Sequence, residues 1–254
     1  MREDKNMIDL TDFGFTTIPR QEKASRVKDL FGRVASRYDV MNDLMSLGLH
    51  RQWKKSYIHR MQLHQNNIIL DVAGGTGDIS LLLHKTFPFL KLTTTLIDLT
   101  PSMLNEGRRK AIDQGIVNRI NWCAGQAEAL PISDAYADIY TISFGLRNVA
   151  DRSKALSEAF RALKPGGRFY CLEFSHLEHE ALQKIYDLYS FSVLPFLGKH
   201  VAKDEAAYQY LAESIRKFPS RSNLERELKE IGFTDVRSEA WMDGIVAFHE
   251  AVKS

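Results

Sequence analysis

The stretch Ile68–Asp78, IILDVAGGTGD, decides the fold of this chain. Its continuous apolar start is typical of a β-strand that is buried on both faces, as the strands of parallel sheets are. The glycines at 74, 75 and 77 end the strand, and the pattern from Asp78 to Phe87 indicates a helix. Because glycine has no Cβ, this turn lets a ligand approach the backbone closely. We therefore expect a binding site where the strand ends.

Strand and helix patterns alternate after this stretch. Further strands are predicted at 92–99, 120–124, 137–143 and 168–174, with two more at 234–241 and 245–252. Helices are predicted at 101–115 and 155–163, the second of them stopped by Pro165-Gly166-Gly167. This alternation implies right-handed crossovers and a mainly parallel, seven-stranded, doubly wound α/β sheet with helices on both faces. The ligand of such a sheet lies at the carboxyl ends of its strands.

Residues 1–254 are predicted to form a single domain, because no repeat, low-complexity tract or flexible linker marks a boundary. Apolar residues at helical spacing from Lys23 to Met61, with a break at Gly48, indicate a helical extension that could fold over the site as a lid. The domain then has four parts: the N-terminal extension (1–65), the ligand-binding core (66–176), a helical insertion (177–230) and a closing pair of strands (231–254).

The composition excludes several classes of protein. The 254 residues are 44% hydrophobic and 26% charged, as in a globular domain. A net charge of +2, evenly spread, leaves no electrostatic footprint for nucleic acid. Cys123 and Cys171 form no CxxC pair and the histidines are scattered, so we expect neither a disulfide framework nor a metal. No apolar run approaches the ~20 residues of a membrane-spanning helix, and residues 1–11 lack the apolar core of a signal peptide. A cytoplasmic protein is expected.

The glycine turn is compatible with two kinds of ligand. Gly75-x-Gly77, with Asp98 ending the next strand, fits a dinucleotide fingerprint in which the acid binds ribose hydroxyls. The third glycine of that fingerprint would fall at Ser80, however, and Asp71 would repel a pyrophosphate. S-Adenosylmethionine has no phosphate, and its ammonium and sulfonium groups would be attracted by Asp71. The turn therefore favours this methyl donor, and a nicotinamide-dependent oxidoreductase is the alternative.

Longer motifs lie on both sides of the glycine turn. They are FGRVASRYDVMND (31–43), SLGLHRQW (46–53), AEALP (127–131), ISFGLRNV (142–149), LKPGG (163–167), LEFS (172–175) and YQYLAESI (208–215). With these motifs the chain resembles, over nearly its whole length, the ubiquinone/menaquinone biosynthesis C-methyltransferases. The resemblance implies a Rossmann-like, class I S-adenosylmethionine-dependent methyltransferase fold. It also implies C-methylation of a polyprenylated benzoquinol or naphthoquinol, and the choice of ring stays open.

The resemblance and the glycine turn together define a set of donor-binding residues. The residues expected to bind S-adenosylmethionine are Asp71, Gly75, Thr76, Gly77, Asp98, Gln126, Ala127 and Ser143. Gln126 departs from the family pattern, which more usually has asparagine beside that alanine. Its longer side chain must reach the adenine from a shifted backbone.

Methyl transfer to a ring carbon requires an electron-rich ring, so the enzyme must stabilise a phenolate. The residues expected to act on the quinol are Arg147, Tyr38, Asn148 and Glu173. Arg147 could stabilise the phenolate or activate a water, but it cannot itself be a base. Its alternative role is a salt bridge with Asp151, and Glu173 could equally be a structural partner of Arg147. His176 is a weaker candidate, because a histidine on a surface loop is commoner than a general base.

An insoluble polyprenyl tail implies contact with a membrane. The apolar and aromatic segment 182–197 is predicted to be an interfacial or tail-binding helix, or else a helix packed on the sheet. Basic side chains at 51, 54, 55, 59 and 60 could contact anionic headgroups or form a solvated face. We expect peripheral association with the inner membrane. A homodimer and a complex with other quinone-biosynthesis proteins stay open, as does a non-catalytic S-adenosylmethionine-binding subunit of a lipid-pathway assembly.

Overall fold

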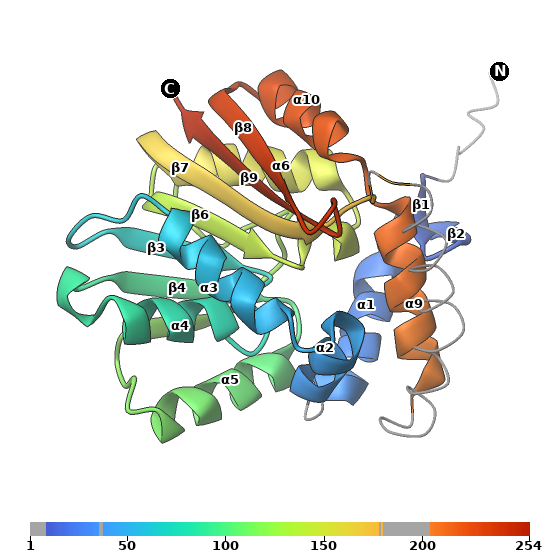
Figure 1. Ribbon diagram of the computed structural model, residues 1–254, viewed down its shortest axis with the longest axis horizontal. Helices are drawn as coiled ribbons and strands as arrows, with labels where there is room; N and C mark the ends of the chain where they lie inside the picture. The colour runs from blue at the N-terminus through green and yellow to red at the C-terminus, as the bar shows by residue number, and fades with distance from the viewer. Residues whose placement is uncertain (1–8, 36–37, 178, 180–203) are drawn as a thin grey trace, which may run out of the picture.

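A seven-stranded sheet in the order β5-β4-β3-β6-β7-β9-β8 forms the centre of the computed structural model (Figure 1), which describes residues 9–35, 38–177, 179 and 204–254. Its strands are β3 (Ile68–Val72), β4 (Thr93–Asp98), β5 (Ile120–Ala124), β6 (Ala137–Ser143), β7 (Leu163–Phe174), β8 (Phe233–Trp241) and β9 (Val246–Lys253). The first five pair in parallel, and β9 is antiparallel to both β7 and β8. The predicted mainly parallel seven-stranded sheet is confirmed.

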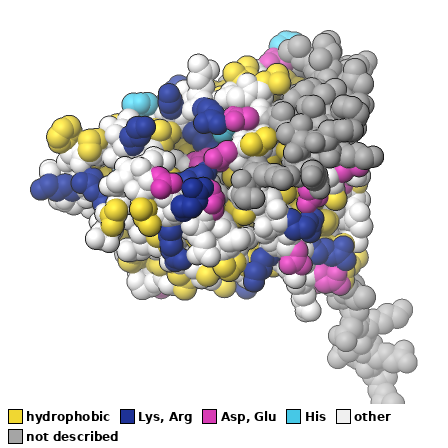
Figure 2. Space-filling view, turned by 90° about the horizontal axis from the view of Figure 1, so that it is seen from below, with side chains coloured by type: hydrophobic (Ala, Val, Ile, Leu, Met, Phe, Trp, Pro, Cys, Tyr) yellow, Lys and Arg dark blue, Asp and Glu magenta, His cyan; other side chains and the backbone are white. Residues whose placement is uncertain are grey.

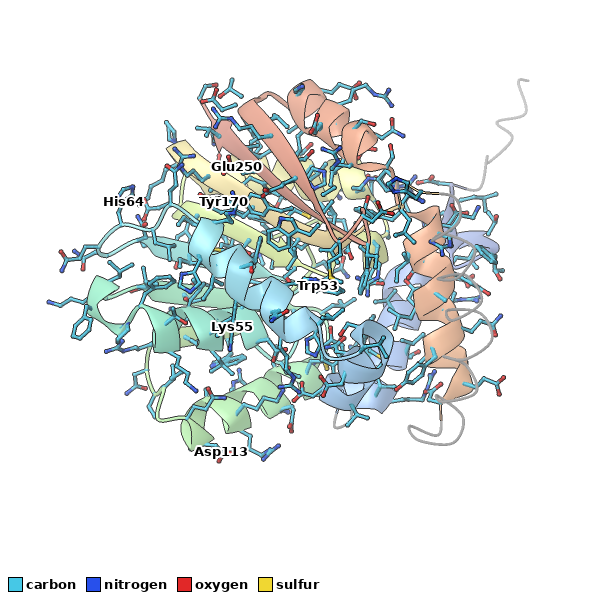
Figure 3. The ribbon with its side chains drawn as sticks, in the orientation of Figure 1. Trp53, Lys55, His64, Asp113, Tyr170 and Glu250 are labelled. Carbon is cyan, nitrogen blue, oxygen red and sulfur yellow. The ribbon has the colours of Figure 1, made fainter. Side chains whose placement is uncertain are left out.

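Helices cover both faces of the sheet. One face carries α3 (His50–Arg60) and α4 (Asp78–Thr86), and the other carries α6 (Arg152–Ala162) and α10 (Arg221–Ile231). The helix α5 (Pro101–Asp113) packs on β4 and β5. Trp53 of α3 points toward the sheet (Figure 3), where its ring centroid lies 6.1 Å from that of Phe174. Burial of these apolar faces is the main term that stabilises the domain.

The strand β7 begins earlier than the sequence predicted. The helix α6 ends before Pro165 as expected, but pairing with β6 resumes at Leu163 opposite Ala137. The register then shifts so that Arg168 pairs with Ile139. The proline and glycines therefore form an irregularity inside a long strand, which is where such residues are tolerated.

The described part of the N-terminal extension contains three helices and a hairpin. The helices are α1 (Arg20–Val34), α2 (Tyr38–Ser46) and α3, and Gly48, at a φ of 78°, separates α2 from α3 as predicted. The hairpin of β1 (Leu10–Phe13) and β2 (Thr16–Pro19) was not predicted. The ring of Phe13 stacks on Tyr210 of α9 (Glu205–Lys217) with 4.3 Å between centroids. The hairpin, α1 and α9 thus lie together beside the carboxyl edge of the sheet (Figure 1).

The predicted membrane segment 182–197 lies outside the described residues. Within the ranges that the structure describes, no helix is long and apolar enough to cross a membrane. Basic and acidic side chains are interspersed on the face shown in Figure 2.

Candidate active site

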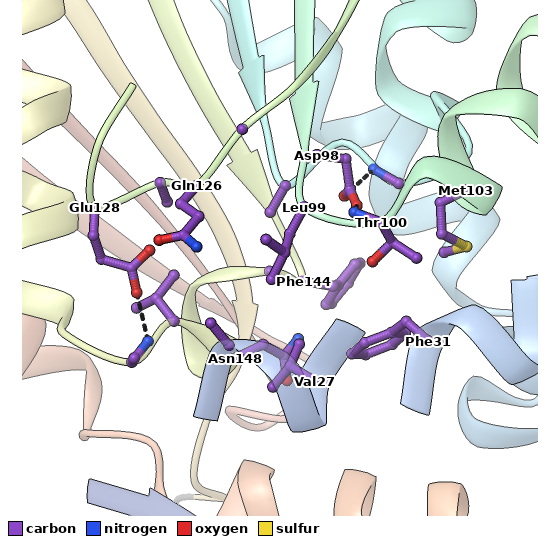
Figure 4. Close-up of a pocket in the computed structure, with 18 of the residues that line it drawn as sticks. Val27, Phe31, Asp98, Leu99, Thr100, Met103, Gln126, Glu128, Phe144 and Asn148 are labelled. Carbon is purple, nitrogen blue, oxygen red and sulfur yellow. Dashed lines mark hydrogen bonds between the residues drawn. The ribbon is translucent and has the colours of Figure 1, made fainter. Parts of the chain in front are cut away.

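A pocket lies at the carboxyl ends of the parallel strands, where the strand order reverses between β3 and β6 (Figure 4). It encloses about 690 Å³, including space open to solvent, which is within the usual range for a small-molecule site. We call it the donor pocket. Its lining includes Ala24, Val27 and Phe31 of α1, Tyr38 of α2, and Gly75, Asp98, Thr100, Met103, Gln126, Ala127, Glu128, Phe144 and Asn148. Six of the residues predicted to bind the donor or the quinol therefore meet in this pocket: Tyr38, Gly75, Asp98, Gln126, Ala127 and Asn148.

Asp98 is the carboxylate of the donor pocket. Its Oδ2 accepts a hydrogen bond from the Gly75 N–H, and its Oδ1 accepts one from the Thr100 N–H, both at 2.8 Å. Burial raises the pKa of Asp98, and the two backbone hydrogen bonds partly offset that rise. Each oxygen has a second lone pair, so a fixed pair of acceptors remains for two neighbouring hydroxyls. This is the arrangement that ribose recognition needs.

The backbone around the donor pocket leaves no room for larger residues. A Cβ at Gly74 would lie 2.6 Å from Leu96, and a Cβ at Gly145 would lie 2.6 Å from the Cβ of Ala73. Ala73 itself has a φ of 51° and Phe144 a φ of 55°, both in the left-handed region. Such conformations cost about 1 kcal/mol or more each and gather at functional sites. They occur here at the ends of the adjacent strands β3 and β6.

A smaller cavity adjoins the donor pocket and shares Tyr38, Ala73 and Phe144 with it. Asp71, Thr76 and Ser143 line this cavity. The Asp71 Oδ2 accepts a hydrogen bond from the Ser80 hydroxyl, whereas its Oδ1 and the Ser143 hydroxyl have no hydrogen-bond partner among the described residues. Buried polar atoms rarely lack a hydrogen-bond partner. The cavity therefore suits a polar, cationic group that can donate to a carboxylate.

Burial raises the pKa of Asp71 to about 7, and the hydrogen bonds with Ser80 reduce the rise. A cation beside Asp71 would favour the ionised form and lower that pKa again. The predicted attraction between Asp71 and a cationic ligand thus has a structural basis.

A network of charges joins α2 to this cavity. The Lys110 ammonium of α5 donates to both carboxylate oxygens of Asp39, at 2.8 and 2.7 Å, and to the Thr76 hydroxyl at 3.1 Å. The Lys54 ammonium of α3 donates to Asp78 at 2.6 Å. Burial alone would raise the pKa of Asp78, but the two ammonium groups outweigh burial and hold it below its usual range. The sequence predicted Lys54 to be one of several surface cations, which is wrong, because Lys54 is buried and paired with Asp78. Asp78 and Lys110 had no predicted role, because only the fold brings these three side chains together.

Arg147 and Glu173 form a buried ion pair beside the donor pocket. Their side chains are 3% and 1% exposed, and Arg147 Nη1 lies 2.6 Å from Glu173 Oε1. The same Nη1 donates to the Phe144 carbonyl at 2.6 Å. The predicted alternative, a salt bridge between Arg147 and Asp151, is wrong, because Asp151 binds Arg20 at 3.0 Å. Glu173 is thus the structural partner of Arg147, which was one of its two predicted roles.

The remaining predicted residues are Asn148, Tyr38, Gly77 and His176, and the structure places them as follows. Asn148 lines the donor pocket, and its Oδ1 accepts a hydrogen bond from the Tyr210 hydroxyl at 3.1 Å. Burial raises the pKa of Tyr38, so its phenol stays protonated at neutral pH. Gly77, at a φ of 81°, is the N-cap of α4. His176 bonds instead with the Phe218 carbonyl at 2.8 Å and lines none of the cavities described above. In the described part of the chain, no group of three or more His, Cys, Asp or Glu side chains could hold a metal ion.

The fold and the site define a class I S-adenosylmethionine-dependent methyltransferase. A Thermotoga maritima structure described as an S-adenosylmethionine-dependent methyltransferase and possible histamine N-methyltransferase superimposes with a TM-score of 0.64 at 17% identity, covering 89% of this chain and 99% of that one. The phosphoethanolamine N-methyltransferase 2 of Haemonchus contortus, in complex with S-adenosyl-L-methionine, gives a TM-score of 0.59 at 16% identity and covers 80% of this chain and 52% of that one. At such identities the likeness concerns the fold.

Sequence similarity is more specific. The model of the ubiE/COQ5 methyltransferase family matches residues 20–253, and the chain belongs to this family. It is 47% identical over 257 residues to a protein of Roseobacter denitrificans named ubiquinone/menaquinone biosynthesis C-methyltransferase UbiE, with 100% of both chains covered. The protein of the same name from Francisella tularensis is 46% identical over 248 residues, covering 96% of this chain and 97% of that one. The family resemblance inferred from the motifs is confirmed.

Proposed function

We propose that this chain transfers a methyl group from S-adenosylmethionine to a ring carbon of a polyprenylated quinol in ubiquinone or menaquinone biosynthesis. The observation that carries the proposal is Asp98, fixed by Gly75 and Thr100 at the end of β4 in a chain of the ubiE/COQ5 family. The oxidoreductase alternative has no such support, since the unpartnered Oδ1 of Asp71, an acceptor, lines the cavity beside the start of α4, where a pyrophosphate would need donors.

The residues present fit the donor. Asp98 would accept from the ribose hydroxyls, and Gln126 with Ala127 would border the adenine across the pocket. The unpartnered Asp71 Oδ1 and Ser143 hydroxyl would bind the cationic amino acid end. When bound, the donor supplies an electrophilic methyl group on a sulfonium. The chain itself holds the two ends and thereby orients that group, and such orientation lowers a barrier by up to roughly 7–11 kcal/mol.

On the acceptor side, the chain would use Asn148, Tyr38 and the Arg147–Glu173 pair. The Tyr210 hydroxyl holds the Asn148 amide oxygen, so the amide NH₂ is oriented to donate to a ring oxygen. Tyr38 can donate in the same way, because its phenol remains protonated. The Arg147 guanidinium, which Glu173 holds at 2.6 Å, adjoins Asn148, and its partial positive charge would favour the phenolate. We propose that α2 acts as a lid that brings Tyr38 to this point.

Two measurements test the function. Calorimetric titration should show saturable binding of S-adenosylhomocysteine and none of NADH. With a short-tailed demethylated quinol, the wild-type chain should produce a methylated quinol, and Arg147→Ala should bind S-adenosylhomocysteine but lose turnover. Equal turnover in wild type and Arg147→Ala would remove Arg147 from the mechanism. Binding of NADH alone would overturn the whole proposal.

We further propose that the chain works in the cytoplasm, peripherally bound to the inner membrane through α2 and α3. Val40 and Leu47 are exposed apolar residues of α2 and of the turn after it, and Arg51 and Lys55 are exposed on α3. A groove beside them is lined by further cations of α4 and α5, Lys85 and Lys110. Apolar side chains next to basic ones are the pattern that binds an anionic bilayer.

Flotation with vesicles that contain phosphatidylglycerol tests this contact. The wild-type chain should float with the vesicles, and an Arg51→Ala/Lys55→Ala variant should float less. The matched control is Arg226→Ala/Lys229→Ala, which removes two exposed cations from α10 on the other face of the sheet. Equal loss in both variants would contradict a specific surface. A homodimer and a complex with other quinone-biosynthesis enzymes remain parts of the proposal, which light scattering and co-purification would test.

A further inference from the structure

A second cavity, of about 490 Å³ including open space, adjoins the segment 146–150 that also borders the donor pocket. Asn148 lines the donor pocket, whereas Arg147 lines this second cavity. Its other walls come from the β1–β2 hairpin, from Lys23 of α1 and from Tyr210 and Lys217 of α9. We call it the Lys23 cavity.

The hairpin wall of the Lys23 cavity is fixed in place. Besides the stacking of Phe13 on Tyr210, the Phe15 N–H donates to the Glu213 carboxylate of α9 at 2.9 Å. The Thr11 hydroxyl donates to the Ala150 carbonyl at 3.2 Å. The unpredicted hairpin therefore joins α9 to the segment 146–150 and closes the cavity between them.

The cavity carries an excess of positive charge. Four cations line it, Lys23, Arg147, Arg152 and Lys217, against one carboxylate, Asp12. Three of the four cations have a carboxylate partner. Arg147 lies 2.6 Å from Glu173, Arg152 lies 2.6 Å from Glu227, and Lys217 lies 3.6 Å from Asp12.

Lys23 is the lining cation that no hydrogen bond or ion pair joins to a described residue, and it is only 6% exposed. The Asp12 and Glu128 carboxylates attract its ammonium without an ion-pair contact. Burial lowers its pKa to about 8, so the side chain is still mainly charged at neutral pH. The Arg147 Nε is a second buried donor with no acceptor among the described residues. A buried ammonium is normally paired, because burying an isolated charge is costly.

We propose that the Lys23 cavity is an oxyanion site, in which Lys23 and the Arg147 Nε bind a phosphate group. Both donors lack a hydrogen-bond acceptor among the described residues, and Thr11, Tyr210 and Ser214 add polar groups to the lining. The four lining cations outnumber Asp12, Glu173 and Glu227 by one positive charge, which favours an anion. The phosphate can come from the solution or from a phospholipid headgroup. S-Adenosylmethionine has no phosphate, so this site is distinct from the donor pocket. Its occupant would neutralise Lys23 and hold the hairpin, α9 and the segment that carries Asn148 together.

Thermal unfolding of the full chain in sodium phosphate, compared with sodium chloride of equal ionic strength, tests the site. Phosphate should raise the Tm saturably. Lys23→Met should abolish this rise, or weaken phosphate binding by about tenfold or more, and it should not lower the Tm in chloride because it removes an unpaired buried charge. The matched control is Lys28→Met, which removes an exposed lysine of the same helix and should respond to phosphate as wild type does.

Two results would overturn the oxyanion site: no effect of phosphate beyond that of chloride, or the same effect in Lys23→Met as in wild type. If Lys23→Met does not fold, Lys217→Met serves instead, because it removes a half-exposed cation of the same lining, and phosphate should then raise the Tm less than in wild type. Flotation with vesicles with and without phosphatidic acid then identifies the source, since a lipid headgroup predicts weaker flotation of Lys23→Met than of Lys28→Met. All of these readouts are independent of methyl transfer, so the site and the proposed function can fail separately.

Discussion

Asp98→Asn is the substitution that most sharply separates donor binding from folding. The change keeps the shape of the side chain but replaces one carboxylate oxygen by an NH₂ group, which cannot accept a hydrogen bond. In the wild-type chain both oxygens already accept from buried backbone N–H groups, those of Gly75 and Thr100. The variant therefore loses one of these contacts, the negative charge, and one of the two acceptors offered to a ribose.

The size of the effect follows from these contacts. A hydrogen bond to a charged acceptor contributes about 1.5–3 kcal/mol, so the Kd for S-adenosylhomocysteine should rise by about 10- to 150-fold. The effect on folding should be smaller. One buried N–H loses its acceptor, which costs about 1–3 kcal/mol. The loss of a buried charge, whose burial raises the pKa of Asp98, offsets part of that cost.

Isothermal calorimetry with S-adenosylhomocysteine measures the Kd, and thermal unfolding of the same samples measures the Tm. Asp113→Asn is the matched control, because it makes the same chemical change at an exposed position near the end of α5 and should bind as wild type does. Wild-type affinity in Asp98→Asn would refute the assignment of Asp98 to the ribose. A folded variant with normal affinity would also leave the fixed carboxylate without a role.

Three further predictions concern the lid, the buried acid and the backbone. Lys110→Met should raise the KM for S-adenosylmethionine and lower kcat/KM by about tenfold, because it removes the link between Asp39 of α2 and Thr76 of the glycine turn. Steady-state kinetics with Lys85→Met as the control measures this. The folded-state pKa of Asp71 lies near 7 against an ordinary 3.8, so its contribution to stability is complete below pH 4 and lost as the pH rises to 7. Between pH 5 and pH 8 the free energy of unfolding of the wild-type chain should therefore fall by up to about 3 kcal/mol relative to that of Asp71→Asn, because about two pH units of this range lie below the folded-state pKa, at roughly 1.4 kcal/mol each. Urea unfolding at the two pH values measures the change, and parallel pH curves would contradict it. Gly107→Ala should lower the free energy of unfolding by about 1–3 kcal/mol, since its Cβ would lie 2.4 Å from Trp122. Gly32→Ala in α1, where a Cβ has room, should raise the free energy of unfolding by about 0.5–1 kcal/mol. Equal Tm values for the two variants would contradict both predictions.

The sheet could be predicted from the sequence because each strand has its own signal. The run at Ile68–Val72 is apolar except for Asp71, and in the structure Ile69 and Leu70 are completely buried. The β1–β2 hairpin had no such signal. Its strands have four residues each, of which only Ile18 is buried, and contacts with α9, nearly two hundred residues away, hold it in place. Local patterns do not contain contacts of that kind.

The candidate site, like the fold, could be predicted from the sequence only in part. Asp98 and the glycine turn belong to one βαβ unit with a known spacing, so their meeting could be expected. The partner of Arg147 could not be settled in this way, because Asp151 is near in sequence while Glu173 is near in space through the pairing of β6 with β7. Lys110 and Lys23 lie on ordinary-looking helices. Their roles depend on which side chains the fold leaves beside them.

The measurement that tests the central claim most directly uses S-adenosylmethionine with a ¹³C-labelled methyl group and a short-tailed demethylated quinol. Nuclear magnetic resonance of the isolated product locates the label. The account predicts a ¹³C methyl group bonded to a ring carbon, formed by the wild-type chain and lost in Arg147→Ala. A label on a ring oxygen, or no transfer by a chain that binds both ligands, would contradict it.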